Sequence, residues 1–192
     1  MTGRREYARG DLIDFLTAVA GGGASGRVYL VGETSQLLEG WCRRVNRLAL
    51  AVEPDFSADA LRRAVHAVSD LRDIAVVWES PGDVIPLPDD YEARSRDTGL
   101  SFDHGVFAVS HFDPYSVALR AVARGDEPDY RLVLGYLRHG WIEPDRMDAL
   151  LEDVLPRFTN ETISQDPAEF RRKYKGLMQM WRAEADGQAI GT

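Results

Sequence analysis

The hydrophobic positions of the chain follow two different periods, and the first half alternates between them. Short continuous apolar runs, as in buried strands, alternate with segments in which apolar residues recur every three or four positions, as on one face of a helix. The predicted strands are residues 28–31, 48–52, 73–78 and 106–110. The predicted helices of this half are residues 11–20, 35–47 and 58–71. The β-branched residues of 73–78 favour a buried position in the sheet for that strand.

The second half of the chain shows the helical period alone. The predicted helices are residues 113–124, 127–138, 144–155 and a last helix that starts at 166. Asp113 and Pro114 are a capping residue and a first-turn proline where the first of these begins. Prolines and acids between 81 and 90 indicate a loop or an edge segment. The pattern therefore predicts an α/β (α+β) fold, with a mixed-sheet core over residues 1–112 and a C-terminal helical bundle over residues 113–192 that packs on it.

The composition is that of an ordinary soluble globular protein. Of the 192 residues, 44% are hydrophobic and 28% are charged. The apolar runs are too short to span a bilayer and the first residues do not read as a signal peptide, so we expect a cytoplasmic protein with no membrane partner. A net charge of -8 makes the chain as a whole a poor partner for nucleic acid. Cys42 is the only cysteine, and the histidines show no metal-binding spacing, so no metal site is predicted.

The turn after the first predicted strand is a candidate phosphate site. The strand ends at Gly32, and Thr34 and Ser35 follow where a helix begins. Backbone N–H groups at a helix start point away from the helix, and the helix dipole favours an anion there.

This stretch resembles the core of small bacterial nucleotidyltransferases of the AbiEii/MenT kind, which occur as toxins in toxin–antitoxin pairs. In that family a strand, a Gly–Gly/Ser turn and a helix precede an Arg-x-Thr-x-Asp-x-Asp motif on the next strand. Gly32, Thr34 and Ser35 fall on the glycine motif, and Arg44 falls on the arginine, with Asn46 in place of the threonine. The resemblance implies a nucleotidyltransferase-like fold and a nucleotide bound by Gly32, Thr34, Ser35 and Arg44.

The two acids of the second motif are absent from this chain. Leu48 and Leu50 stand at their positions, so we expect leucines to line the groove where the metal would bind. Nucleotidyl transfer requires a divalent metal ion held by carboxylates, and two acids spaced by one residue on a strand would reach it from one face. The loss of both acids predicts a site that cannot hold the metal.

The resemblance continues in the second half with further departures. The segment from Asp113-Pro114 to Asp129 is similar to the family's Asp-Pro-hydroxyl, Lys-Leu-x-Arg-Gly and Asp-x-x-Asp region. The lysine position is occupied by Ala121, and the second acid position by Leu132. Several positions that carry a charged residue in the family pattern are apolar in this chain. Loss of the site explains these replacements better than chance does.

Three hypotheses follow. The first is a catalytically degenerate protein that acts as a binding or regulatory component, with a cognate toxin or antitoxin as partner and no cofactor. The second is an active transferase that modifies tRNA or protein with Mg²⁺ and a nucleoside triphosphate, using relocated carboxylates at Glu53, Asp55 and Asp83, with Asp73 as a further candidate. The third is a structural homodimer in which the last helix, with Trp181, forms the interface.

Two groups of basic residues admit two interpretations each. Arg43, Arg44 and Arg47 near the end of the predicted core helix, with Arg62 and Arg63 on the next, are either phosphate or RNA contacts, or cations that favour a helix C-terminus and lie on solvated faces. The basic run at 171–175 either meets an acidic partner or forms a solvated helix face.

Overall fold

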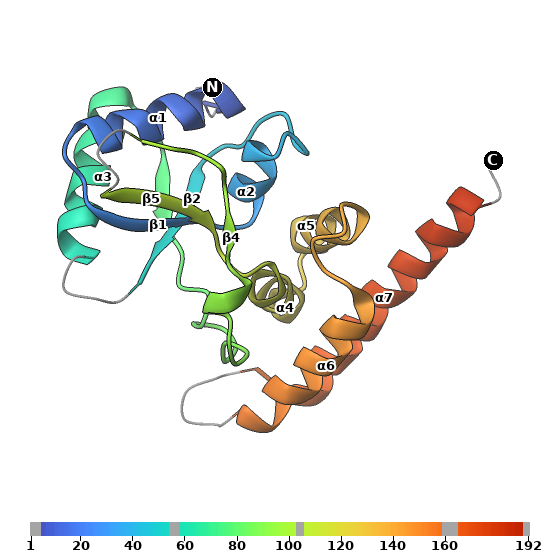
Figure 1. Ribbon diagram of the computed structural model, residues 1–192. Coiled ribbons are helices and arrows are strands. Elements are labelled where there is room, and N and C mark those ends of the chain that lie inside the picture. The colour runs from blue at the N-terminus through green and yellow to red at the C-terminus, as the bar shows by residue number, and fades with distance from the viewer. Residues whose placement is uncertain (1–4, 54–57, 103–105, 159–164, 190–192) are drawn as a thin grey trace. The chain divides into compact units, whose positions relative to one another are not determined.

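A computed structural model describes residues 5–53, 58–102, 106–158 and 165–189, and in these residues it contains seven α-helices and five strands (Figure 1). The chain divides into two compact units. The first consists of residues 1–80 and 95–112, and the second of residues 81–94 and 113–192. None of the described helices combines the length and the apolar character needed to cross a lipid bilayer.

The first unit is built on a mixed sheet of five strands. The strands are β1 (Gly26–Leu30), β2 (Leu48–Val52), β3 (Val76–Trp78), β4 (Arg96–Asp97) and β5 (Phe107–His111), in the spatial order β3-β2-β1-β5-β4. The central strand β1 pairs antiparallel with β2 and parallel with β5. The mixed α/β character predicted from the sequence is confirmed.

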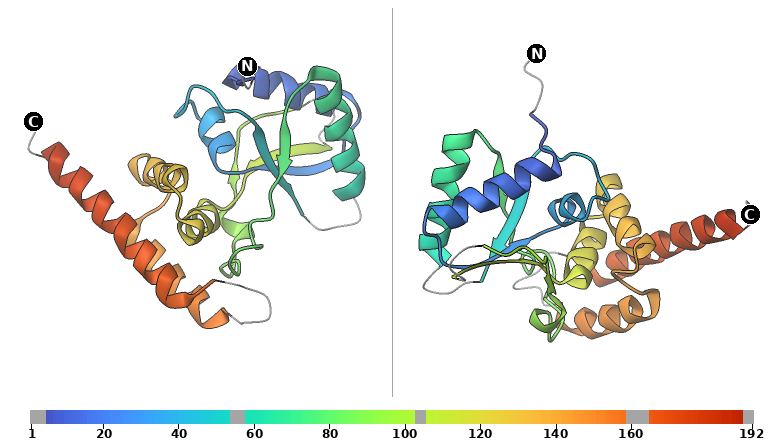
Figure 2. Two further views of the ribbon diagram at one scale, coloured as in Figure 1. Left: turned by 180° about the vertical axis from the view of Figure 1, so that it is seen from behind. Right: turned by 45° about the horizontal axis from the view of Figure 1, so that its top comes forward.

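Helices α1 (Arg9–Gly21) and α3 (Ala58–Arg72) cover one face of this sheet (Figures 1 and 2). Their apolar residues, including Phe15 and Leu61, join the sheet residues that alternate onto the same face in one core. The sheet residues of this core are Val28 and Leu30 of β1, Leu48 and Leu50 of β2, and Phe107 and Val109 of β5. Since strand side chains alternate between faces, the residues between them emerge on the opposite face.

The helix after β1 is shorter than the predicted range of 35–47. Helix α2 spans Glu33–Leu38, and the chain then turns toward β2. Gly40 has a φ of 77°, a backbone conformation that ends a helix and that glycine adopts without steric cost. Leu37 and Val45, which the predicted helix would bury, are both in the core. Val45 lies outside α2, however, and is held there by an antiparallel bridge to Tyr7.

The prediction of a buried third strand is wrong. Strand β3 starts at Val76, three residues later than predicted, and it lies at the edge of the sheet. Its three residues are half-buried. Trp78 is covered by Arg62 of α3, whose guanidinium carbon lies 5.5 Å from the centre of the indole ring. The β-branched residues thus belong to a strand that α3 covers on one face. In the described residues, β2 is the only strand that pairs with it.

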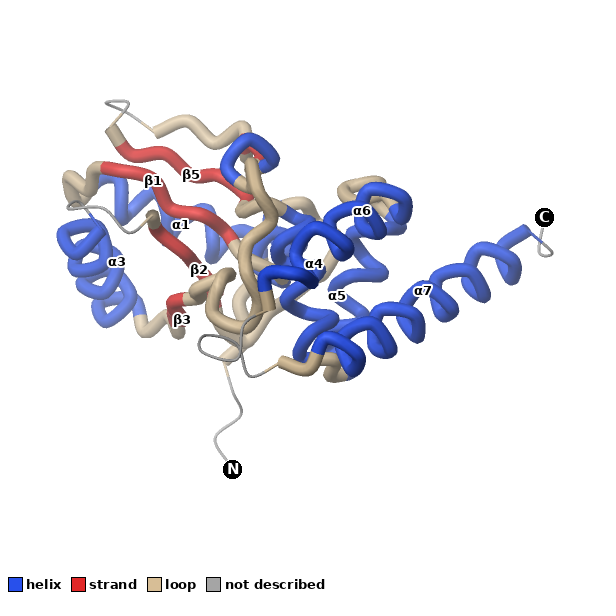
Figure 3. The backbone as a smooth tube through the Cα atoms, turned by 90° about the horizontal axis from the view of Figure 1, so that it is seen from below, coloured by secondary structure: helices blue, strands red, loops and turns tan. Residues whose placement is uncertain are grey.

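The second unit consists of helices around α4 (Pro114–Arg124), which contacts all three of the others (Figure 3). These are α5 (Glu127–Arg138), α6 (Pro144–Val154) and α7 (Pro167–Ala189), with short 3-10 turns at Glu92–Arg94 and Leu155–Arg157. Because α4 is enclosed by neighbours, nine of its eleven residues are buried. The helical bundle predicted for the second half is confirmed.

Residues 81–94 belong to the helical unit and not to the predicted domain 1–112. Three arginines hold this segment. Arg120 of α4 donates two hydrogen bonds to Asp83, at 2.8 and 3.0 Å. Arg157 donates to the carbonyl oxygen of Leu87 at 2.8 Å. Arg94 itself binds Asp113 at 2.9 Å. The sequence pattern identified the segment as a loop but could not show which unit its polar groups bind.

Asp113 is the cap of α4 that the sequence predicts, and its carboxylate is fully buried. It accepts hydrogen bonds from the backbone N–H groups of Tyr115 and Ser116 and from the Ser116 hydroxyl, at 3.1, 3.3 and 2.7 Å. With Arg94, the side chain therefore joins the start of α4 to the segment 81–94.

We expect Asp113→Ala to lower the free energy of unfolding by about 3 kcal/mol or more, because it removes the cap and leaves the largely buried Arg94 without its carboxylate. Asp113→Asn keeps a capping oxygen but not the charge, so its loss should be smaller. Urea titration followed by circular dichroism measures both. Losses of less than about 1 kcal/mol for both variants would show that the pair contributes little.

Candidate functional site

The turn at Gly32 connects β1 to α2. Gly32 has a φ of 60° and a ψ of -124°, a backbone conformation open to glycine and strained for other residues. The two hydroxyl residues that follow are fully buried. The Thr34 hydroxyl accepts from the backbone N–H of Ala49 at 2.7 Å, and the Ser35 hydroxyl donates to the carbonyl of Leu30 at 3.0 Å. These hydroxyls, which the resemblance assigns to nucleotide binding, instead join α2 to strands β1 and β2.

The start of α2 differs from the predicted phosphate site. The backbone N–H of Thr34 donates to Val31, and that of Gln36 donates to Gly32. The helix has only six residues, so the dipole that would favour an anion is short. In this geometry the turn is a structural joint between β1 and α2.

The prediction that Leu48 and Leu50 line a metal-binding groove is wrong. Both leucines are fully buried in the core beneath α1 and α3. Ala49 and Ala51 carry the side chains that emerge on the opposite face of β2. Neither face of this strand therefore presents an oxygen ligand for a hard cation such as Mg²⁺.

Glu53 lies at the wrong end of the strand pair to replace the missing acids. Because β1 and β2 are antiparallel and Val52 pairs with Val28, the chain leaves β2 near the beginning of β1. Gly32 is four residues further along β1 than Val28, which is about 13 Å at the rise of a strand. Asp55 lies outside the described residues.

The carboxylate of Glu53 has a partner of its own. It accepts a hydrogen bond from the hydroxyl of Tyr29, a buried residue of β1. Burial and this hydrogen bond raise the pKa of Tyr29, so the phenol remains protonated and donates. Arg27 lies beside this pair, and its interaction with Tyr29 raises the pKa of the guanidinium further. The cluster joins the beginning of β1 to the end of β2.

The other candidate acids are also paired and lie in separate places. Burial would raise the pKa of Asp83, but the hydrogen bonds and charge of Arg120 outweigh that effect, so the pKa lies below its ordinary value. Asp73 is exposed and forms an ion pair with Arg5 at 3.2 Å. Within the ranges that the structure describes, no three His, Cys, Asp or Glu side chains gather as a metal site would require.

The remaining motif residues of the second half are found on α4 and α5. Asp129 binds Arg124, with 3.1 Å between Oδ2 and Nε. Ala121, at the position of the family lysine, is fully buried in the helical unit, where a lysine would have to lose its hydration. The cation next to it, Arg120, is bound to Asp83.

The basic residues expected at the end of the core helix lie in the loop after α2 instead. Arg43, Arg44 and Arg47 are exposed, as the interpretation as solvated cations expects, but they do not lie at a helix C-terminus. Arg44 is 3.8 Å from the carboxylate of Glu6. On α3, Arg62 stacks on Trp78, while Arg63 is exposed.

A polar pair that the sequence pattern did not predict joins a buried histidine to an exposed glutamate. His111, at the end of β5, is 3.0 Å from the carboxylate of Glu39, which follows α2. Burial lowers the pKa of His111, and the charge of Glu39 opposes that effect. The alternation through Phe107 and Val109 continues to His111, so the period of two would have placed this histidine on the covered face of β5.

Comparison of the chain with models of protein families, with curated proteins and with solved structures finds no match. The resemblance to nucleotidyltransferases therefore depends on the motif residues alone.

A matched pair of substitutions tests which face of β2 could present ligands. We expect Leu48→Asp to cost about 4 kcal/mol of stability or more, because it places an unpaired charge in the core. Ala49→Asp, on the opposite face, should cost less than about 2 kcal/mol. Thermal and urea unfolding of the two variants measure the difference. Equal losses would show that the two residues do not face opposite environments.

Proposed function

We propose that this protein is a nucleotidyltransferase-like chain without transfer activity, which acts by binding another macromolecule as a regulatory component of a toxin–antitoxin pair. The observation that carries the proposal is the composition of β2. Its covered face holds Leu48 and Leu50, its opposite face holds Ala49 and Ala51, and the nearest following acid, Glu53, lies at the far end of the strand pair from Gly32.

The Gly32 turn supports the same proposal. A transferase needs donors at this turn that can approach the phosphates of a nucleotide. Here the Thr34 and Ser35 hydroxyls are buried and bound to the backbone of the sheet. The residues that match the glycine motif thus serve stability, as expected of a site that has lost its substrate.

A protein partner fits the charge of the chain better than tRNA does. The net charge of -8 repels a polyanion, and the exposed Arg43, Arg44 and Arg47 offset this only locally. We therefore favour the cognate toxin or antitoxin as partner. A single cysteine and such a partner fit the reducing cytoplasm.

The alternative is an active, metal-dependent transferase that modifies tRNA or protein through Glu53 and Asp55. It is tested by incubating the purified chain with radiolabelled nucleoside triphosphates, Mg²⁺ or Mn²⁺, and tRNA or protein substrates. We expect no incorporation above that of a heat-denatured sample. The matched variants are Glu53→Gln and Asp55→Asn, which should behave as the parent does.

Metal-dependent incorporation that disappears in Glu53→Gln or Asp55→Asn would contradict the proposal and establish the alternative. Calorimetric titration with the same nucleotides supplies a second measurement. We expect no heat of binding, whereas metal-dependent binding that requires Asp55 would again favour the active enzyme.

A further inference from the structure

Strand β3 of the first unit is an edge strand that side chains hold at both ends. In the described residues it pairs with β2 alone, over the short span Val76–Trp78. Such a short strand at the edge of a sheet gains little from its own backbone hydrogen bonds, and weakly held segments open locally. The side chains that bind β3 therefore determine how readily it opens.

The beginning of β3 is held by Tyr7, from the segment before α1. The Tyr7 hydroxyl accepts from the backbone N–H of Ala75 at 2.8 Å and donates to the carbonyl oxygen of Asp73 at 3.3 Å. Asp73 has a φ of 52°, in the left-handed region, and Arg5 binds its carboxylate. Neither a phenol nor a peptide group changes its charge between about pH 5 and pH 8, so mild acid leaves the contacts of the Tyr7 hydroxyl intact.

The end of β3 is held by Trp78, which faces helix α3. Trp78 pairs with Leu50 in the register of β2 and β3, so its side chain lies on the same covered face. The indole N–H donates to Nε2 of His66 on α3 at 2.9 Å, and the centres of the two rings are 6.0 Å apart. The guanidinium of Arg62, one turn earlier on α3, lies over the same indole. Two residues of α3 therefore bind this one side chain of the edge strand.

The hydrogen bond from Trp78 requires the neutral form of His66. The indole nitrogen carries a hydrogen and can only donate, so Nε2 of His66 must accept through its lone pair. A protonated imidazole carries a hydrogen on both nitrogens and has no acceptor left. Protonation would therefore place two N–H groups against each other, and this bond between α3 and β3 would break.

The charged residues around His66 act on its protonated form as well. On α3, Arg62 and Arg63 lie one turn before it, and Asp70 lies one turn after it. Directly after β3, the nearest charged residue is Glu79, which the alternation of the strand places on the opposite face of the sheet. A protonated His66 would face Arg62 at the same indole ring, while Asp70 would attract it. Because His66 is exposed, a proton can reach it without unfolding of the unit.

We propose that His66 is a proton-sensitive clip at the edge of the sheet: in its neutral form it holds Trp78 and the end of β3 against α3, and in its protonated form it releases them. Histidine changes its charge between about pH 5 and pH 8, so β3 opens more often as the pH falls through that range. The loss of one hydrogen bond corresponds to about a fivefold change in such an opening equilibrium. The clip is independent of the proposed function, because it uses no residue of the Gly32 turn.

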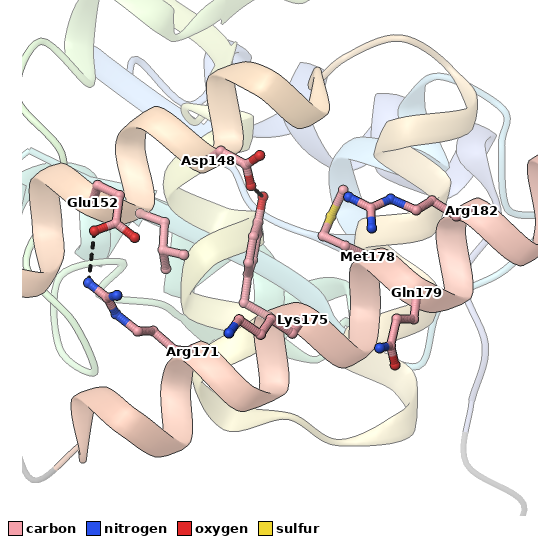
Figure 4. Close-up of a pocket in the computed structure, with 9 residues that line it drawn as sticks. Asp148, Glu152, Arg171, Lys175, Met178, Gln179 and Arg182 are labelled. Atoms are coloured by element: carbon pink, nitrogen blue, oxygen red, sulfur yellow. Dashed lines mark hydrogen bonds and ion pairs between the residues drawn. The ribbon is translucent and has the colours of Figure 1, made fainter.

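The contact between α6 and α7 in the second unit supplies an internal reference. There Tyr174 donates to Asp148 at 2.6 Å, and Arg171 forms an ion pair with Glu152 at 2.8 Å (Figure 4). Burial raises the pKa of Tyr174, and the hydrogen bond to Asp148 raises it further, so the phenol keeps its proton throughout the range in which histidine titrates. None of these side chains is a histidine, so we expect this helix pair to be insensitive to mild acid.

Nuclear magnetic resonance of the full-length chain tests the clip. The chain has four tryptophans, and the indole N–H signal that disappears in Trp78→Phe belongs to Trp78. We expect this signal to move upfield as the pH falls from about 8 to about 5, because its hydrogen bond is lost. Protection of the Glu79 amide, which donates to Leu50 at 2.8 Å, should fall about fivefold after correction for the intrinsic exchange rate. Protection of the amides of α7 should stay constant.

The variant His66→Gln keeps an acceptor, the amide oxygen, but does not titrate. Its Trp78 signal and its protection of Glu79 should be constant over the same pH range. The matched control is Tyr7→Phe, which weakens the other end of β3 and should lower protection equally at every pH. Circular dichroism verifies that the variants fold. An unchanged Trp78 signal or constant protection of Glu79 in the parent would overturn the proposal, and so would a titration that persists in His66→Gln.

Discussion

The antiparallel pairing of β1 with β2 is the constraint on which the rest of the first unit depends. Its register sets Leu30 opposite Leu50 and Val28 opposite Val52, so it determines which residues of β2 enter the core. A shift by one residue would exchange the leucines for the alanines and expose the core face. The same register separates the Gly32 turn from Glu53, because the two strands run in opposite directions. Among the residues that the structure describes, the lack of a carboxylate cluster at the turn therefore depends on this pairing and on the apolar residues of β2.

The helical unit depends on paired charges in a similar way. Arg120 and Arg157 bind an acid and a carbonyl of the segment 81–94. The buried Asp113 accepts from Arg94 of that segment and from the start of α4. Such pairs fix positions more than they add stability, since desolvation offsets much of their attraction. Asp83, which the sequence offers as a candidate catalytic acid, here holds the segment 81–94 to α4.

The sequence supported the element types and the general architecture because each depends on local pattern. The helices of the second half and the cap at Asp113 follow from spacing and turn residues. The sequence could not show on which face of the sheet Leu48 lies, that β3 is an edge strand, or to which unit the segment 81–94 belongs. All three depend on contacts between segments that are far apart in the sequence. The contact of His111 with Glu39 also depends on distant segments, although the alternation through Phe107 and Val109 does indicate the covered face for His111.

The central claim is that no carboxylates converge on a metal ion where β1 meets β2. A crystal of the protein soaked with Mn²⁺ and a non-hydrolysable nucleoside triphosphate, measured at the manganese absorption edge, tests it most directly. The account predicts no anomalous peak beside β1 or β2. A manganese peak coordinated by Glu53 and Asp55, with the nucleotide phosphates on the same ion, would contradict it.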